Sequence, residues 1–261
     1  MPDSERLCIW NNRGLFMGYL PEFGMRRQGA AAVCVGLDKE IEISTDEREW
    51  IRCRTALTQP LTDHAIRFDG GYCALLFIDP HNPDFSQLVK SNAEGQRHGM
   101  FIALREESWL IDVLLQIRQT RPNGDITRYL SKLRFCESED SRPTFDDRLT
   151  PVMRHMLANL AENTTVEELA QIAQMSPSSL EHLFKQHVGI PMRMFRNWFR
   201  MKAAVLAASK GKSLTEAALT AGFFDSAHFS RAFKETFGLP PSEIFSPRRK
   251  LEWFIEDTAA F

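Results

Sequence analysis

The sequence lacks the patterns that usually mark a disulfide-bonded protein, a metalloprotein or an enzyme. Its five cysteines, at positions 8, 34, 53, 73 and 136, are odd in number, scattered and without a CxxC pair. Neither a disulfide framework nor a zinc site is therefore indicated, and buried free thiols are expected. There is no nucleophile elbow, no phosphate-binding loop and no supported pair of carboxylates. We predict no catalytic activity and no cofactor.

Long apolar runs are also missing. No stretch of about 18 apolar residues occurs, and no signal peptide opens the chain, which predicts a cytoplasmic protein with no membrane partner. The composition, 43% hydrophobic and 25% charged, is that of a soluble globular protein. A length of 261 residues leaves room for two domains.

Charge is unevenly distributed along the chain. Residues 1–150 hold 19 Lys and Arg against 23 Asp and Glu, whereas residues 151–250 hold 13 against 8. The last eleven residues carry a net charge of −3. A basic block within an acidic chain fits a phosphate-binding surface on one domain.

Two stretches toward the C-terminal end repeat one pattern. Val166 and Leu214 open them at an offset of 48, and Gly189 and Gly238 close them at an offset of 49. Each stretch has a short Ala-containing amphipathic helix, a turn, and a second helix with a Phe-rich inner face. Ser176 followed by Pro177 marks a helix start. The repeat predicts two helix-turn-helix units.

The outer faces of the two second helices carry short polar residues and end in a basic residue, which suits helices lying in a DNA major groove. The predicted base contacts are Ser178, Glu181, His182, Ser226, Ala227, Ser230 and Arg231. The predicted phosphate contacts are Lys185, Lys234, Arg196 and His228. Arg231 could instead grip a phosphate or pair with Glu235, four residues on. The alternative for each unit is an ordinary helical hairpin with a solvated face.

Residues 150–250 resemble the DNA-binding domain of AraC-type (AraC/XylS) transcriptional regulators. The matching stretches are Val166-Glu167-Glu168-Leu169-Ala170, Met175-Ser176…Leu180…Phe184-Lys185…Gly189, and Leu214-Thr215-Glu216-Ala217-Ala218…Gly222-Phe223…Ser226…Phe229-Ser230-Arg231-Ala232-Phe233-Lys234…Phe237-Gly238…Pro241. His182, Met192 and Ile244 depart from the family's usual Arg, Pro and Tyr. The resemblance implies that a long helix at 192–209 holds the two recognition helices about 34 Å apart, one turn of DNA. We expect its Arg196, Arg200 and Lys202 to be exposed, for phosphate contact or surface pairing.

The first 80 residues read as β structure. Short apolar runs occur at Ala31–Leu37, Ile41–Ile43, Trp50–Cys53, Ala65–Phe68 and Tyr72–Ile78, separated by polar, Gly or Pro residues. This spacing predicts a sandwich or barrel. It resembles, more weakly, the cupin-like N-terminal domain of many AraC-type regulators. A metal-binding cupin would show a His-x-His pair, which is missing, so His64, His81 and His98 are expected to be surface or loop residues.

A helix expected at about Arg105–Gln119 is apolar on two sides. Trp109, Leu110, Val113, Leu114 and Ile117 form one stripe. Ile111 and Leu115 lie on another side, so the helix needs two partners. The second partner is either another subunit, which makes these two residues dimerisation candidates, or a third helix at Asp125–Phe135.

The sequence thus predicts an α+β protein of two domains. Residues 1–135 form a cupin-like β-barrel or sandwich with appended helices, for sensing or dimerisation, and 136–145 form a linker. Residues 146–250 form an all-α domain of two helix-turn-helix units joined by a long helix, and 251–261 form an acidic and apolar tail.

The predicted function is a sequence-specific, double-stranded DNA-binding transcription regulator that acts as a homodimer. RNA polymerase and a small-molecule effector bound in the N-terminal domain are candidate partners. The alternative is a cupin-type small-molecule-binding protein or metal-dependent enzyme with an incidental helical domain.

Overall fold

The chain forms two units in a computed structural model that describes residues 4–121, 125–136, 145–246 and 248–256. One unit, here called the sheet unit, contains residues 4–136 and 245–256. The other, the helical unit, contains residues 145–244. The chain therefore leaves the sheet unit, builds the helical unit and returns to the sheet unit. The predicted linker at 136–145 lies almost wholly outside the described residues.

The sheet unit contains two sheets. The eight-stranded sheet has the order β10-β11-β7-β4-β9-β2-β1-β12, and the four-stranded sheet has the order β3-β8-β5-β6. The strands are β1 (Glu5–Trp10), β2 (Arg13–Tyr19), β3 (Phe23–Arg26), β4 (Ala31–Gly36), β5 (Ile41–Ser44), β6 (Ile51–Cys53), β7 (Thr55–Thr58), β8 (His64–Arg67), β9 (Tyr72–Ile78), β10 (Gln96–Arg97), β11 (Met100–Ile102) and β12 (Leu251–Ile255).

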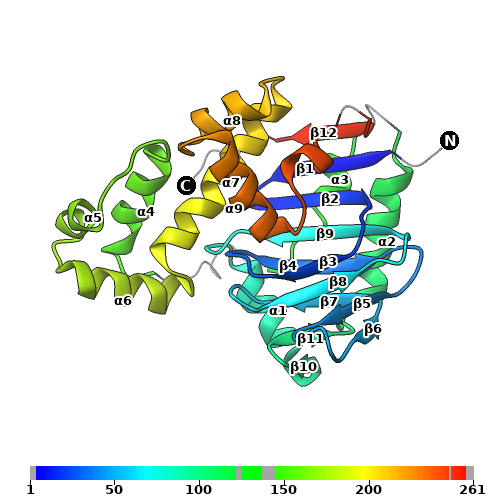
Figure 1. The fold of residues 1–261 in the computed structure, drawn as a ribbon. Coiled ribbons are helices and arrows are strands. Elements are labelled where there is room, and N and C mark those ends of the chain that lie inside the picture. The colour runs from blue at the N-terminus through cyan, green and yellow to red at the C-terminus, as the bar shows by residue number, and fades with distance from the viewer. Residues whose placement is uncertain (1–3, 122–124, 137–144, 247, 257–261) are drawn as a thin grey trace. The chain divides into compact units, whose positions relative to one another are not determined.

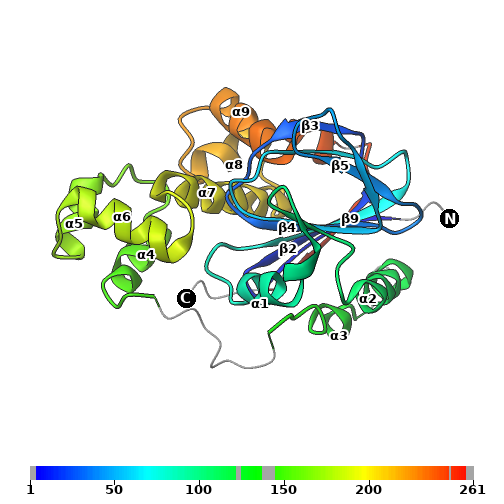
Figure 2. The same ribbon diagram turned by 90° about the horizontal axis from the view of Figure 1, so that it is seen from below.

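The two sheets are stacked, and helices cover the outer face of the larger one (Figure 2). Of the predicted alternatives, the sandwich is therefore correct, and the described strands do not form one closed barrel. All five predicted strands are present, as β4, β5, β6, β8 and β9. The sequence reading missed the others, because short strands such as β10 and β11 carry too few residues to show an alternation.

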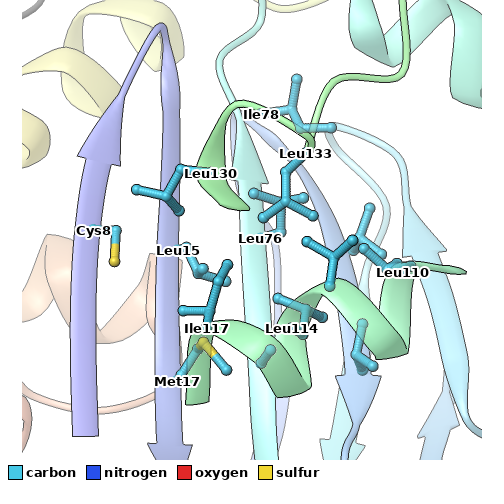
Figure 3. Packing of buried hydrophobic residues seen from close by; sticks show 14 of the residues in the cluster. Cys8, Leu15, Met17, Leu76, Ile78, Leu110, Leu114, Ile117, Leu130 and Leu133 are labelled. Carbon is cyan, nitrogen blue, oxygen red and sulfur yellow. The ribbon is translucent and has the colours of Figure 1, made fainter. Parts of the chain in front are cut away.

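Three helices pack on the larger sheet: α1 (Asp84–Ser91), α2 (Glu107–Gln119) and α3 (Thr127–Leu130). A hydrophobic cluster joins one face of β1, β2, β4 and β9 to Leu110, Leu114 and Ile117 of α2 (Figure 3). Burial of such surface is the main stabilising contribution in a domain of this size, about 25 cal/mol per Å².

The outer side of α2 differs from the prediction in two respects. Trp109 is 38% exposed, with its ring edge-on to Phe135 at 5.9 Å, because it sits at the margin of an apolar stripe that the sheet already fills. Ile111 and Leu115 are half-buried and pack against the same core as the inner stripe. The predicted third helix is shorter than expected, since α3 covers only Thr127–Leu130.

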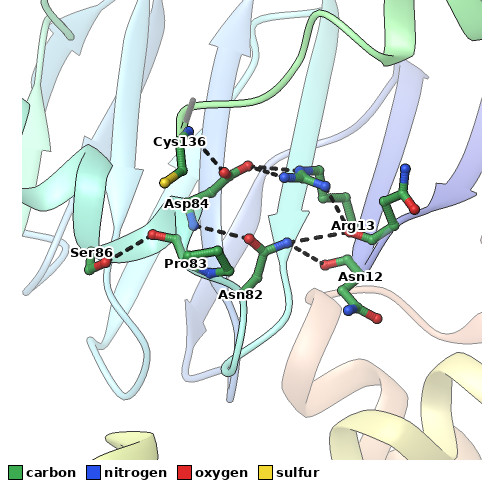
Figure 4. Close-up of polar contacts among 8 residues, drawn as sticks. Asn12, Arg13, Asn82, Pro83, Asp84, Ser86 and Cys136 are labelled. Atoms are coloured by element: carbon green, nitrogen blue, oxygen red, sulfur yellow. Dashed lines mark hydrogen bonds and ion pairs between the residues drawn. The ribbon is translucent and has the colours of Figure 1, made fainter. Parts of the chain in front are cut away.

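A buried ion pair fixes the point where the chain leaves the sheet unit. Arg13 of β2 binds Asp84 of α1, with Nε 2.8 Å from Oδ2, and the other carboxylate oxygen of Asp84 accepts from the backbone N–H of Cys136 at 3.1 Å (Figure 4). Asn82 caps the same turn by accepting from the Asp84 N–H at 3.0 Å. The cluster ties β2, α1 and the segment that ends at Cys136 together.

The returning chain adds a strand to the sheet unit. Leu251–Ile255 forms β12, which pairs in parallel with β1, so that Glu5 is opposite Leu251 and Ile9 opposite Ile255. Arg6 holds this edge, donating to Glu252 at 3.0 Å and to the carbonyls of Ile117 and Thr120. The sequence reading of residues 251–261 as a tail is therefore wrong for the described part.

The helical unit contains α4 (Leu149–Ala158), α5 (Val166–Ile172), α6 (Pro177–Val188), α7 (Met192–Ser209), α8 (Leu214–Thr220), α9 (Ser226–Phe237) and α10 (Pro241–Ile244). Figure 1 shows the helices of this unit as ribbons. The core of the unit is rich in aromatic residues, with Phe184, Phe195 and Phe199 around α7 and Phe223, Phe229 and Phe233 around α9. No described helix of the chain is long and apolar enough to cross a membrane.

Candidate nucleic-acid interface

The first helix-turn-helix unit consists of α5 and α6. Thr165 and Glu168 form a capping box at the start of α5, in which each side chain accepts a backbone N–H of the other residue. Ser176 caps α6 by accepting from the Ser179 N–H at 3.2 Å, and Gly189 ends it at φ +83°. These caps satisfy the free N–H groups of both helices and fix where α6 begins.

The second unit, α8 and α9, is built in the same way. Ser213 and Glu216 form the capping box of α8. Asp225 caps α9 by accepting from the His228 N–H at 2.6 Å, and Gly238 ends it at φ +82°. The internal repeat of the sequence is thus a repeat of helix starts and ends, as predicted.

The turns of the two units contain a residue in the left-handed region at equivalent positions. Gln174 has φ +53° in the first unit, and Gly222 has φ +87° in the second. A Cβ on Gly222 would lie 2.6 Å from the Ala161 Cα and 2.7 Å from the Leu160 carbonyl oxygen. The second turn therefore needs glycine for two reasons, its backbone conformation and its close approach to the chain after α4.

Helix α7 joins the units and is pinned by two arginines. Arg200 is buried and donates to the Leu160 carbonyl at 2.7 Å and to the Glu162 carbonyl at 3.1 Å. Arg196 is half-buried and donates to the Thr164 carbonyl at 2.8 Å. Burial lowers the pKa of both guanidiniums. The expectation that they are exposed is wrong, because the loop between α4 and α5 folds back over them.

The predicted base-contacting residues lie on the outer faces of α6 and α9. Ser178, Glu181 and His182 are exposed on α6. On α9, Ala227 and Arg231 are exposed, and Ser226 and Ser230 are partly exposed. Opposite them, Leu180 and Phe184 anchor α6, and Phe229 and Phe233 anchor α9. Each set therefore faces away from the core of the helical unit.

The predicted phosphate-contacting residues are divided by the structure. Lys185 and Lys234 are exposed, in the last turns of α6 and α9. His228 is partly exposed, and its ring meets the Phe223 ring at 5.4 Å. Arg196 is engaged inside the unit, as described above. Among the predicted phosphate contacts, Lys185 and Lys234 are therefore the two that are fully exposed.

The basic excess near the C-terminal end does not belong to the helical unit alone. Residues 143–244 hold 11 Lys and Arg against 10 Asp and Glu, a net charge of +1. The basic run Arg248-Arg249-Lys250 lies in the sheet unit, where Arg249 donates to Glu5 at 2.8 Å. Attraction to phosphates must come from the placement of single cations, since the net charge of the unit is nearly zero.

The sequence reading overlooked Phe224. It lies in the turn before α9 and is 87% exposed, whereas its neighbour Phe223 is 3% exposed. Leu219 of α8 is also exposed, at 52%. The pair Phe223-Phe224 was a usable signal, because a strand-like turn places adjacent side chains on opposite sides and only one can enter the core.

Comparison with known proteins identifies this arrangement. Residues 169–246 match the model of a family described as a helix-turn-helix domain. The XylDLEGF operon transcriptional activator 3 of Pseudomonas putida is 35% identical over 130 residues, which are 46% of this chain and 38% of that protein. The arabinose operon regulatory protein of Escherichia coli is 29% identical over 170 residues, 64% of this chain and 52% of that protein.

The helical unit therefore matches a helix-turn-helix family model, and the chain is similar in sequence to these operon regulators. The chain spans only about a third to a half of the length of the curated relatives that it matches. Solved structures of ToxT from Vibrio cholerae extend the likeness of fold to both units: one has a TM-score of 0.58 at 13% identity and covers 90% of this chain and 97% of that chain. Among the described residues of this chain, no group of three or more His, Cys, Asp and Glu is placed to hold a metal ion.

Proposed function

We propose that this protein is a sequence-specific, double-stranded DNA-binding transcription regulator that acts in the cytoplasm and works by binding, without catalysis. The observation that carries the proposal is the pair of matched, capped helix-turn-helix units on one AraC-type domain, each with an outward face of short polar residues. Curated relatives of this domain are named as operon regulators.

The proposed contacts divide into two kinds. Ser178, Glu181 and His182 of α6 and Ser226, Ala227, Ser230 and Arg231 of α9 read base edges in successive major grooves. Lys185 and Lys234 bind phosphates, with His228 beside them. The 18 residues of α7 span about 27 Å at about 1.5 Å per residue, which suits a spacer between grooves one helical turn apart.

The sheet unit supplies regulation in this proposal. It binds a small-molecule effector and joins two subunits through α2, and RNA polymerase is the further protein partner. One ToxT structure of the same fold is described as bound to an unsaturated fatty acid, which supports an effector for the fold. Sedimentation of the full chain tests the dimer: Ile111→Glu should yield a folded monomer, and a wild-type monomer at micromolar concentration would contradict the proposal.

The test of DNA binding is its dependence on salt. Affinity of the full chain for genomic duplex fragments should fall linearly on a log–log plot against salt, because Lys185 and Lys234 displace counterions. Lys234→Gln should reduce the slope by about one. Lys90→Gln, an exposed lysine of the sheet unit, is the matched control and should change nothing. A slope near zero for the wild type would reject a groove-bound protein.

A further inference from the structure

The two faces of the eight-stranded sheet have different chemistry. The face toward the helices carries large apolar side chains such as Val33, Leu57 and Leu76. The alternate residues, which face the four-stranded sheet, include a run of short side chains: Ala32, Cys34, Ala56, Thr58 and Cys73. The same face also carries larger side chains, Leu75 and Phe77, so the short residues form only part of this wall.

The opposite wall presents a buried arginine. Arg26 of β3 is 5% exposed, and its Nε and Nη1 atoms have no hydrogen-bond partner among the described residues. Its guanidinium lies 4.6 Å from the centre of the Phe23 ring. No described carboxylate forms an ion pair with it. Burial lowers its pKa only to about 10, so the group is charged at neutral pH.

No neighbouring thiol neutralises this charge. Cys34 interacts electrostatically with Arg26, but burial raises the pKa of the Cys34 thiol to about 12, so the thiol is uncharged at neutral pH. A buried cation without a counter-charge is costly, because it gives up hydration and gains nothing in return. The N–H groups of Arg26 therefore require an acceptor, and an anionic acceptor satisfies them best.

Two hydrogen-bond acceptors lie in the same interior. His64 pairs with Arg26 across β3 and β8; its Nδ1 is 2.9 Å from the Thr62 carbonyl and must be the protonated nitrogen, which leaves Nε2 as an unpartnered acceptor. Burial lowers the pKa of His64 to about 3, so the ring is neutral. The prediction that His64 is a surface or loop residue is wrong, since it is fully buried at the start of β8.

Gln28 supplies the second acceptor. It is fully buried, and its Nε2 donates to the Thr58 hydroxyl at 3.5 Å, while that hydroxyl donates to the Ala32 carbonyl at 3.3 Å. The chain of donors fixes the orientation of the amide and leaves Oε1 without a partner. Buried polar atoms without partners are uncommon in folded proteins, and three residues in one interior need a shared explanation.

We infer that the space between the two sheets binds a small hydroxy-carboxylic acid, with its carboxylate on Arg26 Nε and Nη1 and its hydroxyl donating to Gln28 Oε1 or His64 Nε2. The acid provides acceptors for the two unpartnered donors and a donor for an unpartnered acceptor. A simple anion such as chloride satisfies Arg26 alone. This inference rests on the proposed function, in which the acid is the effector of the regulator.

A surface cavity of about 620 Å³ on the same unit lacks this signature. Its lining includes Arg67, Arg52 and Lys39, which already pair with Glu22, Glu42 and Asp69. Charges that are satisfied by one another at the surface gain little from a further ligand. The unpartnered polar groups around Arg26 therefore favour the interior over the surface cavity as the ligand site of the sheet unit.

The first experiment measures thermal unfolding and calorimetric binding of the full chain with matched probes. Lactate and mandelate test two sizes of hydroxy acid, lactamide and mandelamide remove the charge, and propionate and phenylacetate remove the hydroxyl. At least one hydroxy acid should raise the melting temperature, its hydroxyl-free partner should bind more weakly, and its amide should not bind. Equal effects of acid and amide, no effect of either acid, or the same effect from chloride would overturn the inference.

The second experiment changes Arg26. Arg26→Met should melt at or above the wild-type temperature without acid, because it removes an unpaired buried charge, and should weaken acid binding by about tenfold or more. Arg52→Met, on exposed β6, is the control and should bind acid as the wild type does. Unchanged acid binding by Arg26→Met would overturn the inference. Should that variant not fold, Arg26→Lys replaces it, and wild-type affinity there would also overturn the inference.

DNA binding separates this inference from the proposed function. Arg26→Met without acid should bind duplex DNA as tightly as the wild type without acid. If the wild type binds DNA but no hydroxy acid, the regulator stands and the effector class is wrong. If the wild type binds the acid but no DNA, the acid site stands and the proposed function fails.

Discussion

The two helix-turn-helix units have matching helix caps but different exposed side chains on their second helices. Both have a capping box, a side-chain cap on the second helix and a left-handed glycine at its end. Their outer faces differ, with Glu181 and His182 on α6 and the long planar fork of Arg231 on α9. The repeat thus preserves a scaffold, while the side chains on the two outer surfaces differ in chemistry.

The turns differ as well. The first turn tolerates Gln174 in the left-handed region, whereas the second places Gly222 against the chain after α4. Arg200 binds that same chain segment through the Leu160 carbonyl. The second turn is therefore also a packing surface for the rest of the helical unit.

The largest expected effect is a loss of stability from a substitution in the turn of the second helix-turn-helix unit. Gly222→Ala should lower the free energy of unfolding by about 3 kcal/mol or more, since it combines left-handed strain with a clash against Leu160 and Ala161 backbone atoms. Gln174→Ala should change it by less than about 0.5 kcal/mol, because a side chain with a Cβ is already tolerated there. Urea unfolding of both variants makes the comparison, and equal losses would show that the two turns are equivalent.

The next effect concerns base reading. Arg231→Ala should cost about 1–3 kcal/mol of binding on a preferred duplex and flatten the preference at one base pair, since Arg suits the O6 and N7 acceptors of guanine. His182→Ala should cost less than about 1 kcal/mol, because His is shorter and only partly charged near neutral pH. Competition with scrambled duplexes provides the readout. A loss from Arg231→Ala that is equal on every sequence, with a salt slope smaller by about one, would assign Arg231 to phosphate.

The capping boxes should behave alike. Thr165→Ala and Ser213→Ala should each lower the free energy of unfolding by about 1 kcal/mol, because each removes the acceptor for one backbone N–H. The Ser213 hydroxyl and backbone lower the pKa of Glu216, so the second box is stabilised above the unfolded pKa of Glu216 and loses this as pH falls. Unfolding curves at neutral and acidic pH check both points, and an effect confined to one box would contradict the structural repeat.

The smallest expected effect is a gain in stability when the strained residue of the first turn is replaced. Gln174→Gly should raise the free energy of unfolding by about 0.5–1 kcal/mol, because glycine removes the strain of a side chain at φ +53°. DNA affinity should not change, since Gln174 lies outside both recognition helices. A destabilised Gln174→Gly variant would mean that the side chain contributes packing that outweighs the strain.

Local signals in the sequence predicted the parts of the fold that depend on neighbouring residues. Ser176-Pro177 and the Ala-rich openings of α5 and α8 specify helix starts within a few residues, and both units form where expected. Long-range packing decided the rest. Arg200 has the sequence features of a surface cation, but the chain near Leu160 covers it. His64 has those of a loop residue, but it begins β8 and is buried between the two sheets.

Because β12 belongs to the sheet unit, a stop codon late in the gene would affect that unit as well as the end of the chain. In a protein whose two domains simply follow one another along the chain, truncation after the last helix leaves the first domain intact. Here the same lesion removes the edge strand from the sheet unit and uncovers the backbone N–H and C=O groups of β1. An uncovered edge strand is a template for aggregation. A mutation that truncates the chain after the helical unit would thus present, in a cell, as loss of the sheet unit's solubility.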